Sequence, residues 1–350
     1  MRRDDAVHAP ARVCPMRMAA DWTPPYPAWS RTFPAGTTEV VVAWFGAQAA
    51  EDRAWAGTLH RALAGPSAPF RIDVGRFVDR AGVANTLTVA YWGGAAAHDA
   101  WRRESEFESW WASPQRLAGP HGYFREVLTL PIDRFETLFS STDAAGVAAG
   151  GTAFGEPVRE HAYWGGARDR IPASAYNPLV SPFGETLPAH GATSTRGRRL
   201  RVRVPENIAV IRSAQDWSAC RDDERAMYRE SVHPVLEEGM RFLRDHPLEV
   251  GCCDMRMVSE LDTHGAATQR TYGLGYFLSL GHLERWAESH PTHLAIFDSF
   301  LKMVERFQGQ LDLRLWHEVS VLPGAGQVFE YVNCHPQTGL LPWFASDAVG

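Results

Sequence analysis

The runs Leu87–Trp92 (LTVAYW) and Tyr272–Phe277 (YGLGYF) are rich in the aromatic and β-branched residues that favour strands. Each run is followed by apolar residues at helical spacing. In both copies an aromatic pair closes the run, and its first member stands ten residues before a tryptophan, Trp101 in the first copy and Trp286 in the second. The match indicates an internal repeat of a strand followed by a helix.

Each copy ends with two further runs that resemble strands, separated by a Leu-Pro turn. The first copy contributes Phe124–Val127 and Phe135–Leu138, and the second contributes Trp316–Val319 and Val328–Tyr331. A strand, a helix and an antiparallel strand pair, repeated, indicate two ferredoxin-like halves whose sheets pack together or close into a barrel.

We therefore predict an α+β fold of duplicated ferredoxin-like units, with antiparallel sheets forming a barrel-like core of the dimeric α+β barrel type and helices around it. The 350 residues would form a single domain, with repeats over about 38–160 and about 161–340. A chain of this length buries roughly 75% of its unfolded surface, so it needs no disulfide or structural metal to fold. The alternative is that aromatic-rich strands and tryptophan-bearing helices recur by chance.

Other segments fit the same sheets. Three further strands are predicted at Val40–Phe45, His161–Trp164 and Asn207–Ile211. Residues 172–197 are rich in Pro, Ser, Gly and Thr and predict a long loop. Residues 218–244 have a helical apolar pattern that Pro234 interrupts, so this helix should be kinked or split.

Composition and charge narrow the class of partner. Hydrophobic residues make up 45% of the chain and charged residues 22%, as in folded globular proteins. The net charge is -6 and no basic tract is present, which argues against nucleic acid and against an anionic membrane as the main partner. The substrate is expected to be small and not strongly charged.

Three features predict a cytoplasmic protein. The five cysteines include no Cys-x-x-Cys pair, which fits a reducing compartment. Residues 1–20 lack the continuous apolar core of a signal peptide. The longest apolar run, which starts at Val40, is far shorter than the roughly 20 residues of a membrane-spanning helix.

His293, in the run SHPTHLAIF, is the first histidine with a candidate role. Positions 293, 297, 300 and 304 follow helical spacing, so His293 should share an inward-facing apolar stripe with Phe297 and Phe300. A neutral imidazole facing an apolar cavity can bind a haem iron on its proximal side. However, a histidine on an apolar face is more often a hydrogen-bonded core residue. His290, just before the helix and outside the stripe, is the weaker candidate.

Three further polar residues are predicted to point inward. Alternation along Leu311–Val321 places His317 on the apolar face of a strand and the polar side chains from position 312 to 320 on the other. Ser213 alternates with Ala209 and Ile211, and Arg170 follows the strand predicted at residues 161–164. The alternative for Ser213 is a turn residue, and the alternative for Arg170 is a surface salt bridge. The chain has no serine elbow, P-loop, zinc spacing or dinucleotide fingerprint.

Seven longer runs occur in one order along the chain: HGYFRE (121–126), RFETL (134–138), EHAYWGGARDR (160–170), NIAVIRSAQDW (207–217), LERWAESHPTHLAIF (283–297), LWHEVSV (315–321) and FEYVNCHPQTG (329–339). On these runs the sequence resembles the aldoxime dehydratases, haem b lyases that include aliphatic aldoxime and phenylacetaldoxime dehydratases. The resemblance spans nearly the whole chain, from about Trp22 on.

The resemblance implies roles for five residues. His293 in HPTHL would be the proximal haem ligand, and His317 in WHEVSV would be the distal acid. Arg170, the second arginine of RDR, and Ser213 of IRSAQDW would orient the oxime hydroxyl. Glu136 of RFETL would be a distal-side carboxylate with a supporting role. The stretch between the two histidines is a few residues longer than the family pattern, which would alter the end of the helix near residues 308–310.

The implied reaction is dehydration of an aldoxime, R-CH=N-OH, to a nitrile and water, with the substrate nitrogen on ferrous haem b. Hydroxide is a poor leaving group, and a histidine, whose ordinary pKa is near 6.5, can protonate the departing oxygen and then help to remove the carbon-bound proton. Ser213 and Arg170 would hold the hydroxyl in line. The family also implies a homodimer.

Three other functions stay open at this stage. Another haem reaction, such as a peroxidase or chlorite-dismutase-like activity, could use a similar duplicated scaffold. A non-catalytic haem sensor or carrier would use His317 only to bond a gas ligand. A cofactor-free protein would keep both histidines as hydrogen-bonded core residues. The sequence does not distinguish a preference for aliphatic from one for aryl aldoximes.

Overall fold

The computed structural model describes residues 12–49, 52–150, 154–191 and 194–349. Its strands are β1 (Glu39–Gln48), β2 (Arg71–Val78), β3 (Ala84–Trp92), β4 (Gly122–Pro131), β5 (Phe135–Phe139), β6 (Arg199–Val202), β7 (Ala209–Asp216), β8 (Cys252–Leu261), β9 (Ala267–Phe277), β10 (Arg314–Val321), β11 (Val328–Val332) and β12 (Ser346–Ala348). Both runs that open the predicted repeat are strands, as expected, because they end β3 and β9.

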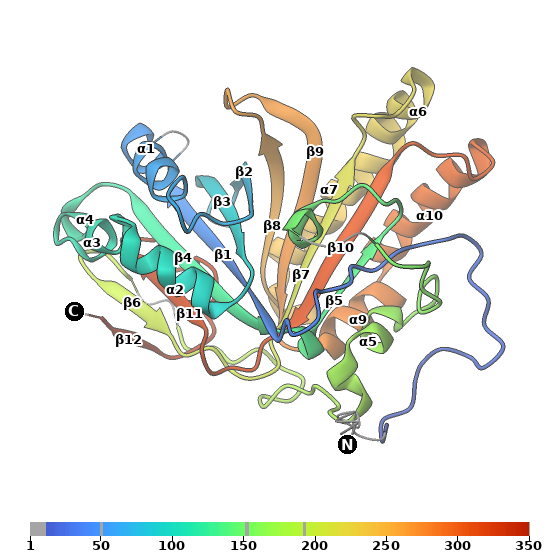
Figure 1. The fold of residues 1–350 in the computed structure, drawn as a ribbon, viewed down its shortest axis with the longest axis horizontal. Coiled ribbons are helices and arrows are strands. Elements are labelled where there is room, and N and C mark those ends of the chain that lie inside the picture. Colours follow the sequence, from blue (N-terminus) through green and yellow to red (C-terminus); the bar gives the residue numbers. More distant parts are fainter. Residues whose placement is uncertain (1–11, 50–51, 151–153, 192–193, 350) are drawn as a thin grey trace, which may run out of the picture.

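The helices lie on the outer faces of the sheet (Figure 1). They are α1 (Arg53–Ala62), α2 (Ala95–Glu104), α3 (Phe107–Ala112), α4 (Gln115–Ala118), α5 (Gly166–Arg170), α6 (Asp222–Met227), α7 (His233–Asp245), α8 (Pro247–Val250), α9 (Leu280–Ser289) and α10 (Pro291–Arg306). None of them is long and apolar enough to cross a bilayer, within the part of the chain that the structure describes.

All the strands join one antiparallel sheet in the order β12-β6-β11-β4-β1-β3-β2-β8-β9-β7-β10-β5. Figure 1 shows the sheet curled into two wings, with α1 to α4 over one and α7, α9 and α10 over the other. The predicted α+β class with an antiparallel sheet is confirmed. The barrel stays half open, because β12 and β5, at the two ends of the sheet, do not pair with each other.

The middle of the sheet contains the same strand order twice. One wing has β4-β1-β3-β2 and the other has β10-β7-β9-β8, and the wings join where β2 pairs with β8. Both sets follow the chain order strand, helix, two strands, helix, strand, which is the ferredoxin-like arrangement. The sequence did not predict β2 and β8, which form the join.

The antiparallel strand pair predicted at the end of each copy is wrong. β5 pairs with β10 rather than with β4, and β11 pairs with β4 rather than with β10. In each copy a proline, Pro131 at the last position of β4 and Pro323 just after β10, ends the strand. Proline cannot donate to a ladder hydrogen bond, and the chain turns away instead of folding back as a tight hairpin.

Two tyrosine–glutamate hydrogen bonds join the wings in the buried core. Tyr91 on β3 donates to Glu318 on β10 at 2.9 Å, and Tyr276 on β9 donates to Glu126 on β4 at 2.7 Å. Arg256 on β8 lies 2.7 Å from Glu126, and its side chain is almost completely buried. A buried charge is tolerated only when it is paired, so these contacts fix how the wings meet.

The strand predicted at residues 161–164 is also wrong. Ala162 has a φ of 61° and Gly165 a φ of 97°, so this segment turns in the left-handed region instead of extending. The strand predicted to begin at residue 207 begins at Ala209 and continues to Asp216. The strand predicted from residue 311 begins at Arg314.

Two irregular segments agree with their predictions. The interrupted helix consists of α6 and α7 joined by a π-helical turn at Tyr228–Val232, with Pro234 in the first turn of α7. The predicted loop at 172–197 has a short 3-10 turn at Pro172–Ala175, and no strand occurs among its described residues. The prediction that residues 1–20 form no signal peptide falls partly on residues 1–11, outside the described residues.

Candidate functional site

Three neighbouring strands carry the candidate polar residues on one face of the sheet. His317 on β10 lies directly opposite Ser213 on β7, and Glu136 on β5 lies opposite Val319, two residues after His317. Side chains two apart on a strand share a face, and opposite residues have their Cβ atoms about 5 Å apart. The strand register alone therefore brings three of the predicted residues to one surface.

Arg170, the last residue of α5, reaches this surface from the outside. Gly165, the residue just before α5, has a left-handed conformation, which turns the chain back over the sheet. The Nε atom of Arg170 donates to Oε2 of Glu136 at 2.6 Å, and Nη2 lies 3.0 Å from Nε2 of His317. Nη1 donates to the main-chain carbonyl of Glu160. The planar guanidinium thus contacts three groups, as only arginine can.

The pair formed by Glu136 and Arg170 is charged and almost completely buried, with side-chain exposures of 1% and 6%. Burial on its own would raise the pKa of Glu136, but the nearby charges of Arg170 and His317 outweigh it and hold the pKa below its ordinary value. The carboxylate therefore stays ionised at neutral pH. A fixed anion and a fixed guanidinium are then available to position other groups.

Both protonation states of His317 have a partner in this arrangement. When Nε2 carries no proton, it can accept a hydrogen bond from Nη2 of Arg170 at 3.0 Å. When Nε2 is protonated, Oε1 of Glu136 lies 3.1 Å away as an acceptor. His317 was predicted to face an apolar interior, and that is correct only in part: its partners are polar and its side chain is 26% exposed, whereas Val319 and Val321 on the same face of β10 are buried in an apolar cluster.

His293 lies in the first turn of α10, on the helix side of the same wing. Its ring packs against Trp286 at 4.7 Å and Trp164 at 5.7 Å between centroids. The predicted stripe is only partly correct, because Phe297 is 41% exposed. The helix packs instead through Ile296 and the fully buried Met303, and His293, three positions before Ile296, begins this face.

The surroundings of His293 fit a haem ligand. Burial lowers the pKa of the imidazole, an effect that the main-chain carbonyl of Ala287 partly opposes, so the ring is neutral at physiological pH. Nδ1 is buried without a hydrogen bond of good geometry. Half-buried apolar side chains from the sheet and helices of the same cluster lie around this region: Ala167, Ile211, Leu236, Met257, Ala287 and Ile296. A neutral imidazole beside apolar surface suits haem iron.

His161 was not predicted, although it adjoins the polar cluster. The residue is 1% exposed, and in the part of the chain that the structure describes neither ring nitrogen has a hydrogen-bond partner. Its pKa is lowered by burial and by the charge of Arg170. From the sequence, His161 falls in a predicted strand and therefore has no predicted role. Only the left-handed turn at Ala162 brings the His161 ring against Tyr26.

Asp169 is a second residue that the sequence did not point to. Its carboxylate accepts hydrogen bonds from the main-chain amides of Arg17 and Met18 and from the hydroxyl of Tyr163. Asp169 precedes Arg170 on α5, so these bonds hold the short helix in place. No motif marks such a contact, because its partners are main-chain groups more than 150 residues away.

The structure therefore brings four of the five predicted site residues to one surface: Glu136, Arg170, Ser213 and His317. His293 stands apart from them on α10, and within the described residues no hydrogen bond or ring contact joins it to the four. α10 ends at Arg306, and Gln308 and Gly309, in the segment where an altered helix end was predicted, adopt positive φ values.

Comparisons with known proteins agree with this geometry. A profile of the haem-containing dehydratase family matches residues 43–340. The aliphatic aldoxime dehydratase of Pseudomonas chlororaphis is 38% identical over 337 residues, which cover 94% of each chain. The phenylacetaldoxime dehydratase of Bacillus sp. (strain OxB-1) is 37% identical over 334 residues, 93% of this chain and 94% of the relative. A crystal structure of an aldoxime dehydratase in complex with butyraldoxime matches with a TM-score of 0.88 at 35% identity, covering 95% of this chain and 94% of the other.

Proposed function

The chain belongs to the haem-containing dehydratase family, and from that membership we propose that it dehydrates aldoximes to nitriles with a bound haem b. The relatives described above are named as aldoxime dehydratases, and they match nearly the whole chain. Within the chain, one observation carries the proposal: the guanidinium of Arg170 contacts both Glu136 and His317. This joins an ionised carboxylate to a histidine that can exchange a proton.

His293 would hold the haem through its neutral imidazole. Ferrous haem supplies an electron-rich iron that weakens the N–O bond of an oxime bound there. The apolar side chains around His293 would cover the faces of the macrocycle, which buries a large apolar surface. Trp286 and Trp164 fix the plane of the imidazole ring, because they pack against it edge-on.

His317 would act as the acid and then as the base. As an imidazolium it holds a proton on Nε2 while Oε1 of Glu136, 3.1 Å away, stabilises the charge. Once it gives the proton to the departing oxygen, Nε2 can accept from Arg170 instead. The neutral ring can then take the carbon-bound proton of the substrate, so His317 returns to its first state and water leaves.

Arg170 and Ser213 would orient the substrate hydroxyl. Ser213 lies opposite His317 on the neighbouring strand, so a hydroxyl between them can bond both side chains. Arg170 is held by Glu136 and by the carbonyl of Glu160, which leaves its position fixed before substrate arrives. Such preorganisation supplies rate without reorganisation during the reaction.

We propose further that the two wings are ferredoxin-like repeats. In support, β4-β1-β3-β2 corresponds to β10-β7-β9-β8, and Tyr91 and Tyr276 at matching positions bond matching glutamates. A cytoplasmic location is proposed from the five cysteines, which are all free thiols. A homodimer is proposed from the family resemblance, and light scattering of the purified protein tests it.

Replacing His317 with alanine tests the proposed mechanism. The reduced, haem-loaded His317→Ala protein should keep its Soret band and lose nitrile formation from butyraldoxime by at least 100-fold, or about 2.7 kcal/mol. His335→Ala is the matched control, because His335 also pairs with a carboxylate, Asp79 at 2.8 Å, far from the cluster. Unchanged turnover in His317→Ala would exclude the assigned role. Peroxide oxidation without nitrile would favour another haem reaction.

A further inference from the structure

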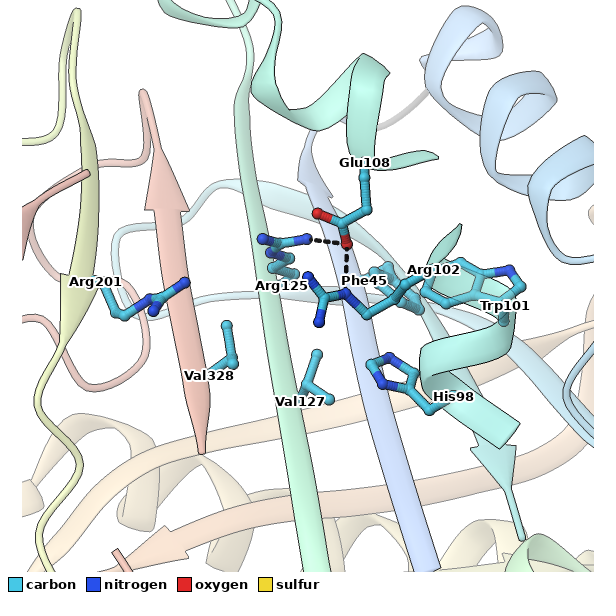
Figure 2. A pocket seen from close by; sticks show the side chains of 9 residues that line it. All are labelled: Phe45, His98, Trp101, Arg102, Glu108, Arg125, Val127, Arg201 and Val328. Atoms are coloured by element: carbon cyan, nitrogen blue, oxygen red, sulfur yellow. Dashed lines mark hydrogen bonds and ion pairs between the residues drawn. The ribbon is translucent and has the colours of Figure 1, made fainter. Parts of the chain in front are cut away.

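A cavity of about 250 Å³ opens on the outer face of the other wing, where the proposed mechanism has no role for it. Figure 2 shows its floor and its rim. Phe45 on β1, Val127 on β4 and Val328 on β11 supply apolar surface from the sheet. His98 and Arg102 approach from α2. The volume is below the roughly 300–1,000 Å³ of pockets for drug-sized ligands, so a smaller molecule would fit.

This cavity occupies the position of the candidate active site in the matching wing. Phe45 and Arg125 are opposite each other on β1 and β4, as Ser213 and His317 are on β7 and β10. Arginine thus stands where the other wing has a histidine, and a phenyl ring stands where it has a hydroxyl. The chemistry of the second cavity must therefore differ from that of the first.

The rim of the cavity is rich in arginine. Four charged residues line it: Arg102, Arg125, Arg201 and Glu108. Figure 2 shows Arg102 and Arg201 reaching towards Arg125 from opposite sides. Asp99, 3.5 Å from Arg102, is half exposed and does not line the cavity.

Arg125 is the most buried of the three arginines, at 8% exposure. Its Nε donates to Glu330 at 2.9 Å and its Nη1 to Glu108 at 2.7 Å, while Nη2 makes no further hydrogen bond within the described residues. Arg201 uses Nε and Nη2 on Glu330, so its Nη1 group is likewise left over. The internal ion pairs fix the guanidinium groups but leave donors on them unused.

His98 provides the second sign of a missing partner. The residue is 8% exposed and lines the cavity, and its buried Nε2 has no hydrogen bond to any described residue. A buried polar atom without a hydrogen bond destabilises the protein, so a ligand group that bonds to this atom would remove the penalty. Burial, aided by the charge of Arg102, lowers the pKa of His98 to about 4, so the ring is neutral near pH 7 and can donate or accept one hydrogen bond.

We propose that this cavity binds a small monocarboxylate with a short hydrocarbon chain. The carboxylate would accept from the unused guanidinium donors of Arg125 and Arg201 and from His98, because charge-assisted bonds from arginine to a carboxylate are short and strong. The hydrocarbon chain of the ligand would lie on Phe45 and Val127. A neutral amide of the same shape lacks the charge and should bind far less well.

Calorimetry on the haem-loaded protein tests this with butanoate as the probe and butanamide as its neutral counterpart. Butanoate should bind at one site per chain without changing the Soret band, and butanamide should bind at least tenfold more weakly. The double variant R102Q/R201Q removes one proposed donor, Arg201, and a second positive charge that lines the cavity, Arg102, so it should weaken butanoate at least tenfold and keep nitrile formation unchanged. Both arginines are about half exposed, so the fold should tolerate the change.

Arg203→Gln is the matched control, because Arg203 also forms a carboxylate pair, with Asp347, just after Arg201 on the chain. This variant should bind butanoate like the unaltered protein. Three results would each overturn the proposal: no butanoate binding up to 20 mM, equal binding in R102Q/R201Q, or binding that shifts the Soret band, which would place the ligand at the haem.

Discussion

The Nη2 atom of Arg170 lies 3.0 Å from Nε2 of His317, although the two residues are 147 positions apart in the sequence. The contact joins α5, which packs on the outside, to β10 in the sheet. Glu136 completes it by contacting both side chains, at 2.6 and 3.1 Å. The polar cluster is therefore assembled before any substrate arrives, and each member can be tested separately.

Arg170→Lys should lower kcat/KM for butyraldoxime about 100-fold while the Soret band is retained. Lysine keeps the positive charge but not the planar fork that contacts Glu136, Glu160 and His317 together, and the loss corresponds to about 2.7 kcal/mol. Arg168→Lys is the matched control on the same helix, since Arg168 binds Glu284 instead. If both variants lose equal activity, the effect comes from α5 as a whole and not from the cluster.

Glu136→Gln should destabilise the protein by about 3 kcal/mol at pH 7, because it leaves Arg170 buried without its anion. The depressed pKa of Glu136 means that its stabilisation is present above the ordinary glutamate pKa of about 4.3 and is lost as pH falls through the lower folded value. Denaturant unfolding should therefore show a gap between variant and parent that narrows below about pH 4.

The surface pair of Glu206 and Arg134 is the control for that experiment. Glu206 is half exposed and 3.3 Å from its partner, so Glu206→Gln should cost less than about 1 kcal/mol at either pH. A Glu136→Gln penalty that is small at pH 7, or that grows in acid, would show that the carboxylate is not ionised in the fold.

Tyr276→Phe and Tyr272→Phe should differ in their effect on stability, although both side chains are fully buried on β9. The Tyr276 hydroxyl donates to Glu126 at 2.7 Å, and its loss should cost about 1–3 kcal/mol. The Tyr272 hydroxyl has no hydrogen-bond partner among the described residues, so its removal should be neutral or slightly stabilising. Thermal unfolding of the two variants measures this. Equal destabilisation would mean that the hydrogen bond between the wings adds nothing to stability.

The sequence predicted those parts of the fold that depend on local pattern. The aromatic runs that end β3 and β9 and the helices that follow them were found, because alternation and helical spacing appear directly in the chain. The pairing partners of β5 and β11 were not predicted. Each of these strands pairs with a strand of the other wing, and no local sequence pattern encodes such a long-range pairing. The strand β2 and the residue at which β10 starts were not predicted either.

The site was predicted less evenly. The register of β7 and β10 alone explains why Ser213 and His317 lie opposite each other, and motif resemblance pointed to Glu136 and Arg170. His161 escaped because its position depends on a left-handed turn at Ala162, a conformation that alanine rarely adopts. The face of α10 was misjudged by one position, because α7 and not the sheet decides which residues of that helix are buried.

The absorption spectrum of haem-loaded protein, compared between the parent and His293→Ala, is the most direct test of haem binding through His293. His290→Ala is the matched control, since His290 caps the same helix by accepting from the amide of Thr292. We predict a Soret band in the parent and in His290→Ala, and its loss or a clear shift in His293→Ala, with recovery on adding free imidazole. A parent protein without a Soret band, or a His293→Ala spectrum identical to that of the parent, would contradict the assignment of His293 as the haem ligand.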